Sequence, residues 1–448
     1  MRLKTGSTTA PVATVGVSRT QSPQRMTHQK CGGATAGGSR TEIGKFGREN
    51  ILRAEQSLLG YKTPGKPTVK PALLIISPDY PPRRGGIADH TQRLAREFAR
   101  EGQVSVLTSR GEAKDDWARV YPLIDDWSDV DQLFVGLESI AHVDVVLWQY
   151  VPHMYGHGGV NLKLPRALWH LQKHQRPQIV LAHEIAAPYS PWPHRLYYAW
   201  AHRSQWRRLL NAADAVGIST EAWLEEWRRQ RQDVAANLFL APSPSNIDVV
   251  KVPHHHRQLW REQQGLPPQA RVLAYFGTLS DAKQFDWVLK AWEAAQAGGP
   301  TALVVIGEKP PMEAPPELAA LFKPLGFLPE AEVSAALQAA DALLLPFVDG
   351  ASERRGSFMA GLAHGCAVVS TLGPNTGSSL RASRVFAGVS SEDAEGFTRL
   401  AGELLADAPR REALGREAAE VYARHYDWPV LARRIQEQMS QMRALPES

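Results

Sequence analysis

Residues 71–86 read PALLIISPDYPPRRGG, and this stretch indicates the class of fold. The apolar run Leu73–Ile76 has the length and composition of a buried strand, which Ser77-Pro78 ends. The pair Gly85-Gly86 comes next, and apolar residues at helical spacing follow over 87–98. A buried strand, a glycine turn and a helix form the first part of a βα unit, which is typical of α/β proteins.

The same alternation repeats along the chain. Further strands are predicted at 104–107, 143–148, 179–181, 215–219, 272–276, 303–306, 342–345 and 367–370. Helices are expected between them, for example at 164–173, 195–212 and 358–364, and the end of the chain, 395–443, is helical and amphipathic. Buried strands that alternate with helices predict doubly wound parallel sheets.

A proline-rich stretch over 241–270 interrupts this rhythm and is the best candidate for an interdomain linker. We therefore predict four parts: an N-terminal extension (1–66), a first Rossmann-like domain (67–250), a second one (251–428) and a C-terminal helix (429–448). The last helix is expected to pack back on the first domain. Ligands of doubly wound sheets bind at the carboxyl ends of the strands, so a cleft between the two domains is the expected site.

Composition excludes several classes of protein. The chain has 448 residues, of which 43% are hydrophobic, and its two cysteines are too few for a disulfide scaffold and suit a reducing cytoplasm. Its apolar runs are far shorter than the roughly 18 residues that a membrane span needs. Residues 1–70 carry 12 Lys and Arg against 3 Asp and Glu, so the rest of the chain has a net charge of −4. A mildly acidic body argues against nucleic acid as a partner.

The extension itself lacks a periodic apolar pattern and is predicted to be disordered, apart from one short helix near 51–59. It has no apolar core of a secretory signal. An organelle transit peptide, a flexible extension and a true start further in, at Met26, remain open.

Two glycine-containing turns are candidates for binding an anion. Gly85-Gly86 would let a phosphate or a sugar approach the N-terminus of the following helix. Residues 277–283 follow a predicted strand of the second domain, and Lys283 in this turn can reach an anionic group above the sheet. An ordinary strand–helix turn and a solvated lysine are the alternatives.

Two further turns carry polar chemistry. Arg354, Arg355, Gly356 and Ser357 lead into a helix and form a plausible diphosphate cradle, with a surface turn as the alternative. His183, followed by Glu184, comes directly after a buried strand and could hydrogen-bond a sugar hydroxyl or relay a proton. A purely structural histidine is the alternative.

Other patterns are weaker. The run His254-His255-His256 lies in the linker without partner acids, and the pair Asp129 and Asp131 is expected to start a helix, so no metal site is predicted. The loop 156–159 resembles the oxyanion loop of some esterases, but the chain has no Gly-x-Ser-x-Gly elbow, no phosphate-binding P-loop and no Gly-x-Gly-x-x-Gly fingerprint. The region Arg195–Arg208 mixes aromatic and basic side chains, which suits either peripheral membrane contact or a partly buried helix.

The order of these pieces resembles glycosyltransferase family 4, whose fold is GT-B, over about residues 71–430. The matching segments are 77–86, 183–184, 213–219, 244–248, 276–283, 304–308, 326–330, 340–346 and 362–370. Each segment alone is a weak signal, whereas their common order is specific.

The resemblance implies a metal-independent, retaining transfer of a sugar from a nucleotide diphosphate donor, such as a UDP- or GDP-sugar, to a glycan, lipid or other acceptor, without a cofactor. The first domain would be the acceptor side, and Gly85 and Gly86 its phosphate loop. His183 and Lys283 would be catalytic. The donor would contact Gly277, Thr278, Lys283, Glu308, Arg354, Arg355, Gly356 and Ser357. Such enzymes serve polysaccharide and glycoconjugate synthesis, in the cytoplasm or at the inner face of the membrane.

The chain departs from the family pattern at three positions. Thr278 stands where an arginine is usual, and Ser352 and Ala360 stand where two glutamates are usual, with Glu353 one residue away from the first. These departures motivate a second hypothesis, an inactive glycosyltransferase-like binding or scaffold protein. A third is another GT-B enzyme, such as a sugar-nucleotide epimerase or a phosphorylase.

Overall fold

The computed structural model describes residues 72–444, except for residues 112, 175, 188 and 190. The predicted disordered extension over 1–66 and its short helix near 51–59 lie outside the described residues. No helix in the described part has the length and the apolar content that crossing a bilayer requires.

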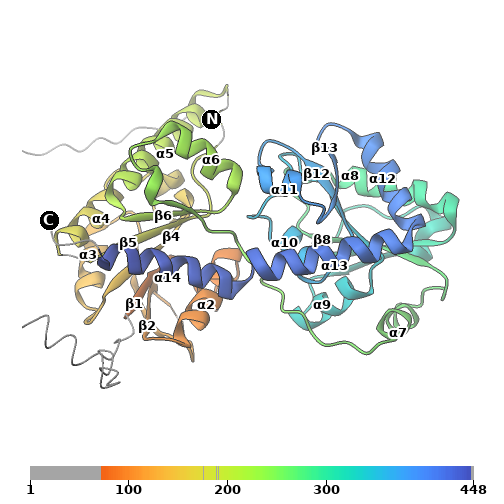
Figure 1. Ribbon diagram of the computed structural model, residues 1–448, viewed down its shortest axis with the longest axis horizontal. Coiled ribbons are helices and arrows are strands. Elements are labelled where there is room, and N and C mark those ends of the chain that lie inside the picture. Colours follow the sequence, from red (N-terminus) through yellow and green to blue (C-terminus); the bar gives the residue numbers. More distant parts are fainter. Residues whose placement is uncertain (1–71, 112, 175, 188, 190, 445–448) are drawn as a thin grey trace, which may run out of the picture. The chain divides into compact units, whose positions relative to one another are not determined.

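The first lobe is a seven-stranded parallel sheet in the order β3-β2-β1-β4-β5-β6-β7 (Figure 1). Its strands are β1 (Leu73–Ile76), β2 (Val104–Ser109), β3 (Arg119–Ile124), β4 (Val145–Tyr150), β5 (Gln178–Ala182), β6 (Ala215–Ile218) and β7 (Leu238–Leu240). Its helices are α2 (Gly86–Ala99), α3 (Val130–Glu138), α4 (Leu164–Lys173), α5 (Pro193–Ala212) and α6 (Glu221–Gln230).

The second lobe is a six-stranded parallel sheet in the order β10-β9-β8-β11-β12-β13. Its strands are β8 (Arg271–Gly277), β9 (Thr301–Gly307), β10 (Phe322–Gly326), β11 (Ala342–Leu345), β12 (Val368–Leu372) and β13 (Ala387–Ser390). The helices that follow the linker are α7 (His256–Gln263), α8 (Phe285–Ala295), α9 (Glu330–Ala339), α10 (Gly356–Ala363), α11 (Ser378–Ala382), α12 (Ala394–Ala406) and α13 (Ala408–His425). Two doubly wound α/β lobes are therefore present, as predicted.

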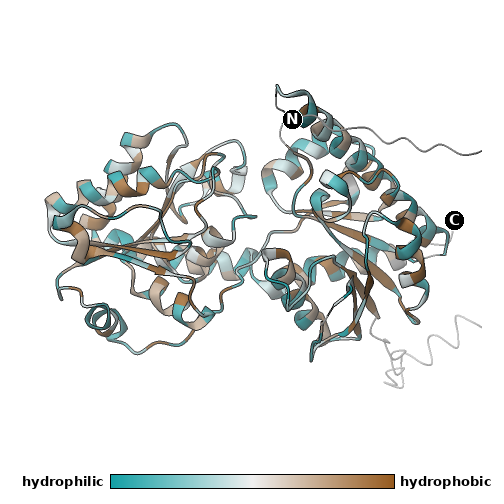
Figure 2. Ribbon diagram, turned by 180° about the vertical axis from the view of Figure 1, so that it is seen from behind, coloured by the Kyte–Doolittle hydropathy of each residue, from teal (hydrophilic) through white to brown (hydrophobic). Residues whose placement is uncertain are grey.

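The central strands form because continuous apolar runs are buried on both faces, as parallel sheets covered by helices require. All four residues of β1 are buried, and all seven residues of β9 are buried as well. Figure 2 shows the strands of both sheets as hydrophobic ribbon, while the surrounding helices mix hydrophilic and hydrophobic segments. Burial of these strands makes the two sheets the cores of their lobes.

Every strand predicted from an apolar run is present, and the predicted helix at 164–173 has those bounds. Four strands were not predicted, namely β3, β7, β10 and β13, and these are the edge strands of the two sheets. Edge strands are short or half-exposed and tolerate proline, as β3 and β10 do at Pro122 and Pro324, so they lack the continuous apolar signal.

The last helix, α14 (Trp428–Ala444), packs against α2, while α13 packs against α10 of the second lobe (Figure 1). Trp428, Leu431 and Ile435 lie in the same buried cluster as Leu73 and Ile75 of β1. The end of the chain therefore completes the core of the first lobe.

Candidate functional site

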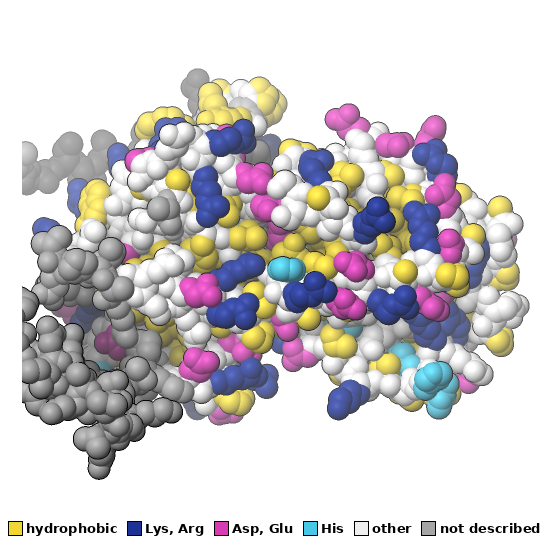
Figure 3. Space-filling model, in the orientation of Figure 1, with side chains coloured by type: hydrophobic (Ala, Val, Ile, Leu, Met, Phe, Trp, Pro, Cys, Tyr) yellow, Lys and Arg dark blue, Asp and Glu magenta, His cyan; other side chains and the backbone are white. Residues whose placement is uncertain are grey.

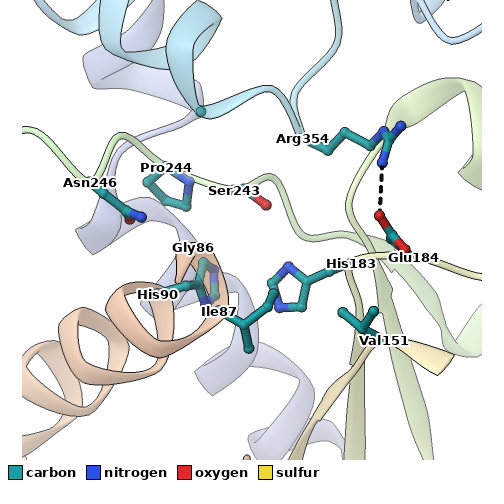
Figure 4. Close-up of a pocket in the computed structure, with 11 residues that line it drawn as sticks. Gly86, Ile87, His90, Val151, His183, Glu184, Ser243, Pro244, Asn246 and Arg354 are labelled. Carbon is teal, nitrogen blue, oxygen red and sulfur yellow. Dashed lines mark ion pairs between the residues drawn. The ribbon is translucent and has the colours of Figure 1, made fainter. Parts of the chain in front are cut away.

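A cavity of about 290 Å³ lies among loops from the carboxyl ends of both sheets and the linker between the lobes (Figure 4). We call it the central cavity. It is lined by Gly86, Ile87, His90, Val151, His183, Glu184, Ser243, Pro244, Asn246, Arg354 and Gly356. Four residues predicted to bind ligand, Gly86, His183, Arg354 and Gly356, are thus brought together from segments up to about 270 residues apart.

Glycines begin the two helices that face the central cavity. Gly85 caps α2 and Gly86 is its first residue, while Gly356 is the first residue of α10. A Cβ added at any of the three would meet no atom within 4 Å, so open space lies in front of each. Free N–H groups and the positive end of the helix dipole at such a position favour an anion.

His183 follows β5 and is 9% exposed, with its Nε2 atom 2.5 Å from Oε1 of Gln149. Burial lowers the pKa of this imidazole to about 4, so the ring is neutral at pH 7. Because the amide oxygen accepts from Nε2, the other nitrogen, Nδ1, is a hydrogen-bond acceptor. A neutral acceptor at the cavity wall suits a sugar hydroxyl rather than a phosphate.

His90 is a cavity residue that the sequence reasoning missed. It lies on α2, is 3% exposed, and its ring centroid is 4.6 Å from that of His183. Its Nδ1 atom is 3.3 Å from Nε2 of Gln149, whereas its own Nε2 has no hydrogen-bond partner in the described part of the chain. Its position four residues after Gly86, on the same helix face, is the signal that could have identified it.

Lys283 lies in the turn after β8 and is half-buried rather than solvated. Its Nζ atom is 5.3 Å from the ring centroid of Tyr275 and 6.0 Å from that of Phe347. Burial, and then the positive charge of Arg355, lower the pKa of this amine to about 8. A Cβ added at Gly277, where φ is +127°, would lie 2.2 Å from Nζ, so glycine leaves the room that the lysine occupies.

The other predicted donor residues surround the same turn. The Tyr275 hydroxyl donates to the backbone oxygen of Thr278 at 2.7 Å, and the Glu308 carboxylate accepts from the N–H of Leu279 at 2.8 Å. Ser357 approaches from α10, with its Cβ 3.8 Å from the Cβ position of Gly277. Lys283, Glu308 and Ser357 are not among the residues that line the central cavity.

Arg354 and Arg355 both interact with Asp349. Nη2 of Arg354 is 3.4 Å from its carboxylate, and Arg355 forms a closer ion pair with it. Burial opposes ionisation of Asp349, but Arg355 and the hydrogen bond from Asn375 outweigh it and lower the pKa of this carboxyl. The two arginines are therefore held in place by a half-buried carboxylate.

Arg354 also connects the two lobes. Its Nη1 atom lies 3.7 Å from Oε1 of Glu184, which follows His183 on the first lobe (Figure 4), and its Cζ atom lies 5.0 Å from the ring centroid of Trp223 on α6. An anionic ligand at Arg354 would compete with the Glu184 carboxylate. Trp223 was not singled out from the sequence because it meets Arg354 only through the packing of the two lobes, whereas Asp349 lies five residues before Arg354 in the same loop.

Of the positions that depart from the family pattern, Thr278 is exposed, whereas the two where glutamates are usual are buried. Ser352, Glu353 and Ala360 each have no exposed surface. Neither carboxylate oxygen of Glu353 has a hydrogen-bond partner among the described residues, and burial, with Glu221 nearby, raises the pKa of this carboxyl to about 7. Glu353 does not line the central cavity, so it takes no visible part in the site.

The weaker patterns have structural roles. Asp129 caps α3 by accepting from the N–H groups of Asp131 and Gln132, as expected for a helix start. The ring of His256 bonds to the backbone oxygen of Ala335 at 2.7 Å. Within residues 72–444 no cluster of three His, Cys, Asp or Glu is placed to hold a metal ion, leaving aside the four residues that are not described.

Helix α5 exposes aromatic side chains near its start. Tyr197 is 54% exposed and Trp200 is 60% exposed, whereas Trp206 on the same helix is fully buried. Figure 3 shows hydrophobic side chains gathered at the upper end of the first lobe, where α5 begins. One face of α5 is therefore buried, as in a partly buried helix, and another face is exposed, while membrane contact stays a prediction.

Part of the second lobe matches the model of a known protein family. Residues 270–407 match the family model described as Glycosyl transferases group 1. No curated protein matches the chain.

Solved structures resemble almost the whole described fold. Sucrose-phosphate synthase from Thermosynechococcus elongatus is 16% identical, with a TM-score of 0.64 over 84% of this chain and 99% of its own. Anabaena HepE in complex with UDP is 14% identical, with a TM-score of 0.60 over 83% and 100% of the two chains. WaaG, a glycosyltransferase involved in lipopolysaccharide biosynthesis, is 16% identical, with a TM-score of 0.58 over 82% and 99%. At such identities the likeness shows the fold, which is GT-B, as predicted.

Proposed function

We propose that this chain transfers a sugar from a nucleoside diphosphate donor to a glycan, lipid or other acceptor, because residues 270–407 match the Glycosyl transferases group 1 model and the fold is GT-B. The proposal includes retention of configuration, no need for a metal ion and a UDP-, GDP- or similar sugar as donor. Structural neighbours whose descriptions name UDP or UDP-glucose as ligands support this donor class.

One observation carries the proposal. The central cavity joins the glycine-started helices α2 and α10 with a neutral histidine and an arginine, His183 and Arg354. Helix N-termini and a guanidinium are complementary to phosphate oxygens, whereas a neutral imidazole is complementary to a hydroxyl. A nucleotide sugar is the ligand that combines both chemistries.

The leaving diphosphate would be stabilised by the second lobe. Arg354, Arg355 and Lys283 are the cations near the start of α10, and the α10 N–H groups add partial positive charge. Lys283 is already partly desolvated, so it needs little further loss of water on binding an anion. Its pKa of about 8 keeps it mostly charged at pH 7.

The transfer exchanges one carbon–oxygen bond for another. The acceptor oxygen bonds to the anomeric carbon as the bond to the diphosphate oxygen breaks, and the hydroxyl proton leaves with the diphosphate. His183 would hold a sugar hydroxyl through Nδ1, since its Nε2 is engaged by Gln149. Loops of both lobes around the cavity would exclude water and so limit hydrolysis.

An inactive sugar- or partner-binding protein is the second candidate. Ala360 and Thr278 lack the side chains usual in the resembling family, and Arg354 and Arg355 are both paired with carboxylates. Such a protein would bind a nucleotide or a sugar yet turn over no donor with a broad panel of acceptors. A GT-B epimerase or phosphorylase has no residue pattern in its favour, although one epimerase is among the structures of similar fold.

A membrane surface is a further partner that we propose, at the exposed aromatic end of α5. Tyr189, Trp192 and Trp200 are each at least 60% exposed there, next to exposed arginines. Aromatic and basic side chains together suit the interface of an anionic bilayer.

The donor proposal is tested by thermal stability with UDP, GDP and ADP in buffer containing EDTA. We expect one of them to raise the melting temperature, because a ligand that binds only the folded state stabilises it. Lys283→Ala should abolish the shift. Lys290→Ala, a change at an exposed lysine on α8, is the matched control and should keep it.

Absence of a shift with every nucleotide would argue against the donor class, and a shift that survives Lys283→Ala would remove this lysine from the site. A shift that appears only with added divalent metal would contradict metal independence. Retention is checked separately by the anomeric configuration of the product in NMR spectra.

A further inference from the structure

A second cavity, of about 420 Å³, lies in the first lobe beside the central one. We call it the α5–α6 cavity, because helices α5 and α6 and the loop after β5 line it. Among its lining residues are Ile185, Tyr189, Arg203, Arg207, Trp223 and Trp227. No part of the donor proposal uses this cavity.

Its walls combine flat rings with cations. Trp223 and Trp227 are half-buried on α6, and the Arg203 guanidinium lies 3.8 Å from the ring centroid of Tyr189. Aromatic faces pack against the C–H faces of sugar rings, and arginine forms paired hydrogen bonds with phosphate or carboxylate. The combination suits a small ligand that has both a sugar ring and a phosphate or carboxylate group.

The positive charge in this cavity is not neutralised by a carboxylate. Arg203 donates to the backbone oxygens of Ala187 and Ala199, and no ion pair of Arg203 or Arg207 is found in the described part of the chain. The one acidic lining residue, Glu226, is paired with Arg229 on its own helix. An anion would therefore find two available guanidinium groups.

The α5–α6 cavity shares its wall with the central cavity. Ile185 lines the former and directly follows Glu184, which lines the latter. Trp223 lines the α5–α6 cavity, and Arg354 of the central cavity lies over its ring at 5.0 Å. A ligand held here would lie next to the place proposed for the donor.

We propose that the α5–α6 cavity is an acceptor subsite for a sugar that carries a phosphate or a carboxylate. This proposal rests on the proposed function. It narrows the class of acceptor to an anionic sugar. Trp223 and Trp227 would hold the sugar ring, and Arg203 and Arg207 would bind its anionic group.

The test is calorimetric titration of the whole chain with glucose 6-phosphate, glucuronate, glucose and inorganic phosphate. We expect at least one anionic sugar to bind, with glucose and inorganic phosphate each about tenfold weaker or more, since each lacks one half of the recognised group. Arg207→Gln and Trp227→Leu should each weaken the anionic sugar about tenfold. Arg208→Gln and Trp169→Leu are matched controls outside the cavity and should leave its affinity unchanged.

Equal binding by Arg207→Gln and the wild type would overturn the proposal, as would glucose binding as tightly as its anionic relatives, or no binding of any probe. Inorganic phosphate binding as tightly as glucose 6-phosphate would reduce the site to a simple anion site and overturn it as well. The melting-temperature shift with nucleotide, measured on the same variants, separates the two proposals. Arg207→Gln should retain the nucleotide shift. If this variant loses sugar binding but keeps the nucleotide shift, the subsite is supported. If the wild type binds the sugar but shows no nucleotide shift, only the donor proposal is refuted.

Discussion

Glu353 is a buried acidic residue whose ionisation would lower the stability of the fold. It lies in the turn between β11 and α10, and its carboxyl group is near Glu221 and Tyr426 without a hydrogen-bond partner in the described residues. An ionised carboxylate in such a place is unfavourable, so the folded protein keeps it protonated at a pH at which the unfolded chain has released the proton.

This difference makes stability depend on pH. The pKa of Glu353 is about 7 in the folded protein against an ordinary value of 4.5, so the folded state binds the extra proton between these values. The free energy of unfolding should therefore fall as pH rises from 4.5 to 7, by roughly 3 kcal/mol at most, and stay low above that. Glu353→Gln removes the ionisable group, so the free energy of unfolding, measured with urea, should change less between pH 4.5 and 7.

The matched control is Glu332→Gln, at an exposed glutamate on α9. The difference between Glu353→Gln and the wild type should grow with pH, whereas the control should run parallel to the wild type. A constant offset for Glu353→Gln across the whole range would show that ionisation of this residue does not limit stability.

Helix α5 has one buried face and one exposed face. Ala199, Trp206 and Leu209 face the core of the first lobe, while Leu196 and Trp200 are exposed on another face of the same helix. Exposure of these apolar side chains to water is unfavourable, and their burial in the interface of a bilayer would remove this penalty. An anionic bilayer would also attract the nearby arginines.

We expect the protein to co-float with vesicles that contain phosphatidylglycerol and less with vesicles of phosphatidylcholine alone. Trp192→Ser combined with Trp200→Ser should lower the bound fraction several-fold, because both side chains are at least 60% exposed on this surface. Phe327→Ser, at a 79% exposed residue of the second lobe, is the control. Equal flotation of the double variant and the control would exclude this surface as the contact.

At the scale of the whole molecule, the core of the first lobe is completed by a helix that follows the second lobe in the sequence. Its core includes Trp428, Leu431 and Ile435 from α14, and the indole of Trp428 donates to the backbone oxygen of Ser245 in the linker at 2.8 Å. The stability of the first lobe therefore depends on residues that follow the second lobe.

Leu431→Ala should lower the free energy of unfolding by about 2–5 kcal/mol, since Leu431 is fully buried and truncation leaves a cavity. Urea unfolding followed by circular dichroism measures the change. Arg433→Ala, two residues away with an exposed side chain, should change it by less than about 0.5 kcal/mol. A small effect of Leu431→Ala would mean that α14 contributes little to the first lobe.

The order of strands and helices could be predicted from the sequence because burial leaves a local pattern. The runs Leu73–Ile76 and Ala342–Leu345 are apolar throughout, as central parallel strands must be, and glycines mark the helix starts at Gly86 and Gly356. Edge strands carry no such pattern, so β3, β7, β10 and β13 became visible only in the folded sheets.

Within the site, the sequence by itself determined which turns follow strands of the parallel sheets, because buried strands leave a local apolar pattern. Only the tertiary structure decided what these side chains contact. His183 meets Gln149 and His90, and Arg354 meets Glu184 of the other lobe, through contacts whose partners lie from 34 to 170 residues away along the chain. Periodicity reports which side of an element is buried, whereas such pairs depend on how whole elements pack, and this information is not local in the sequence.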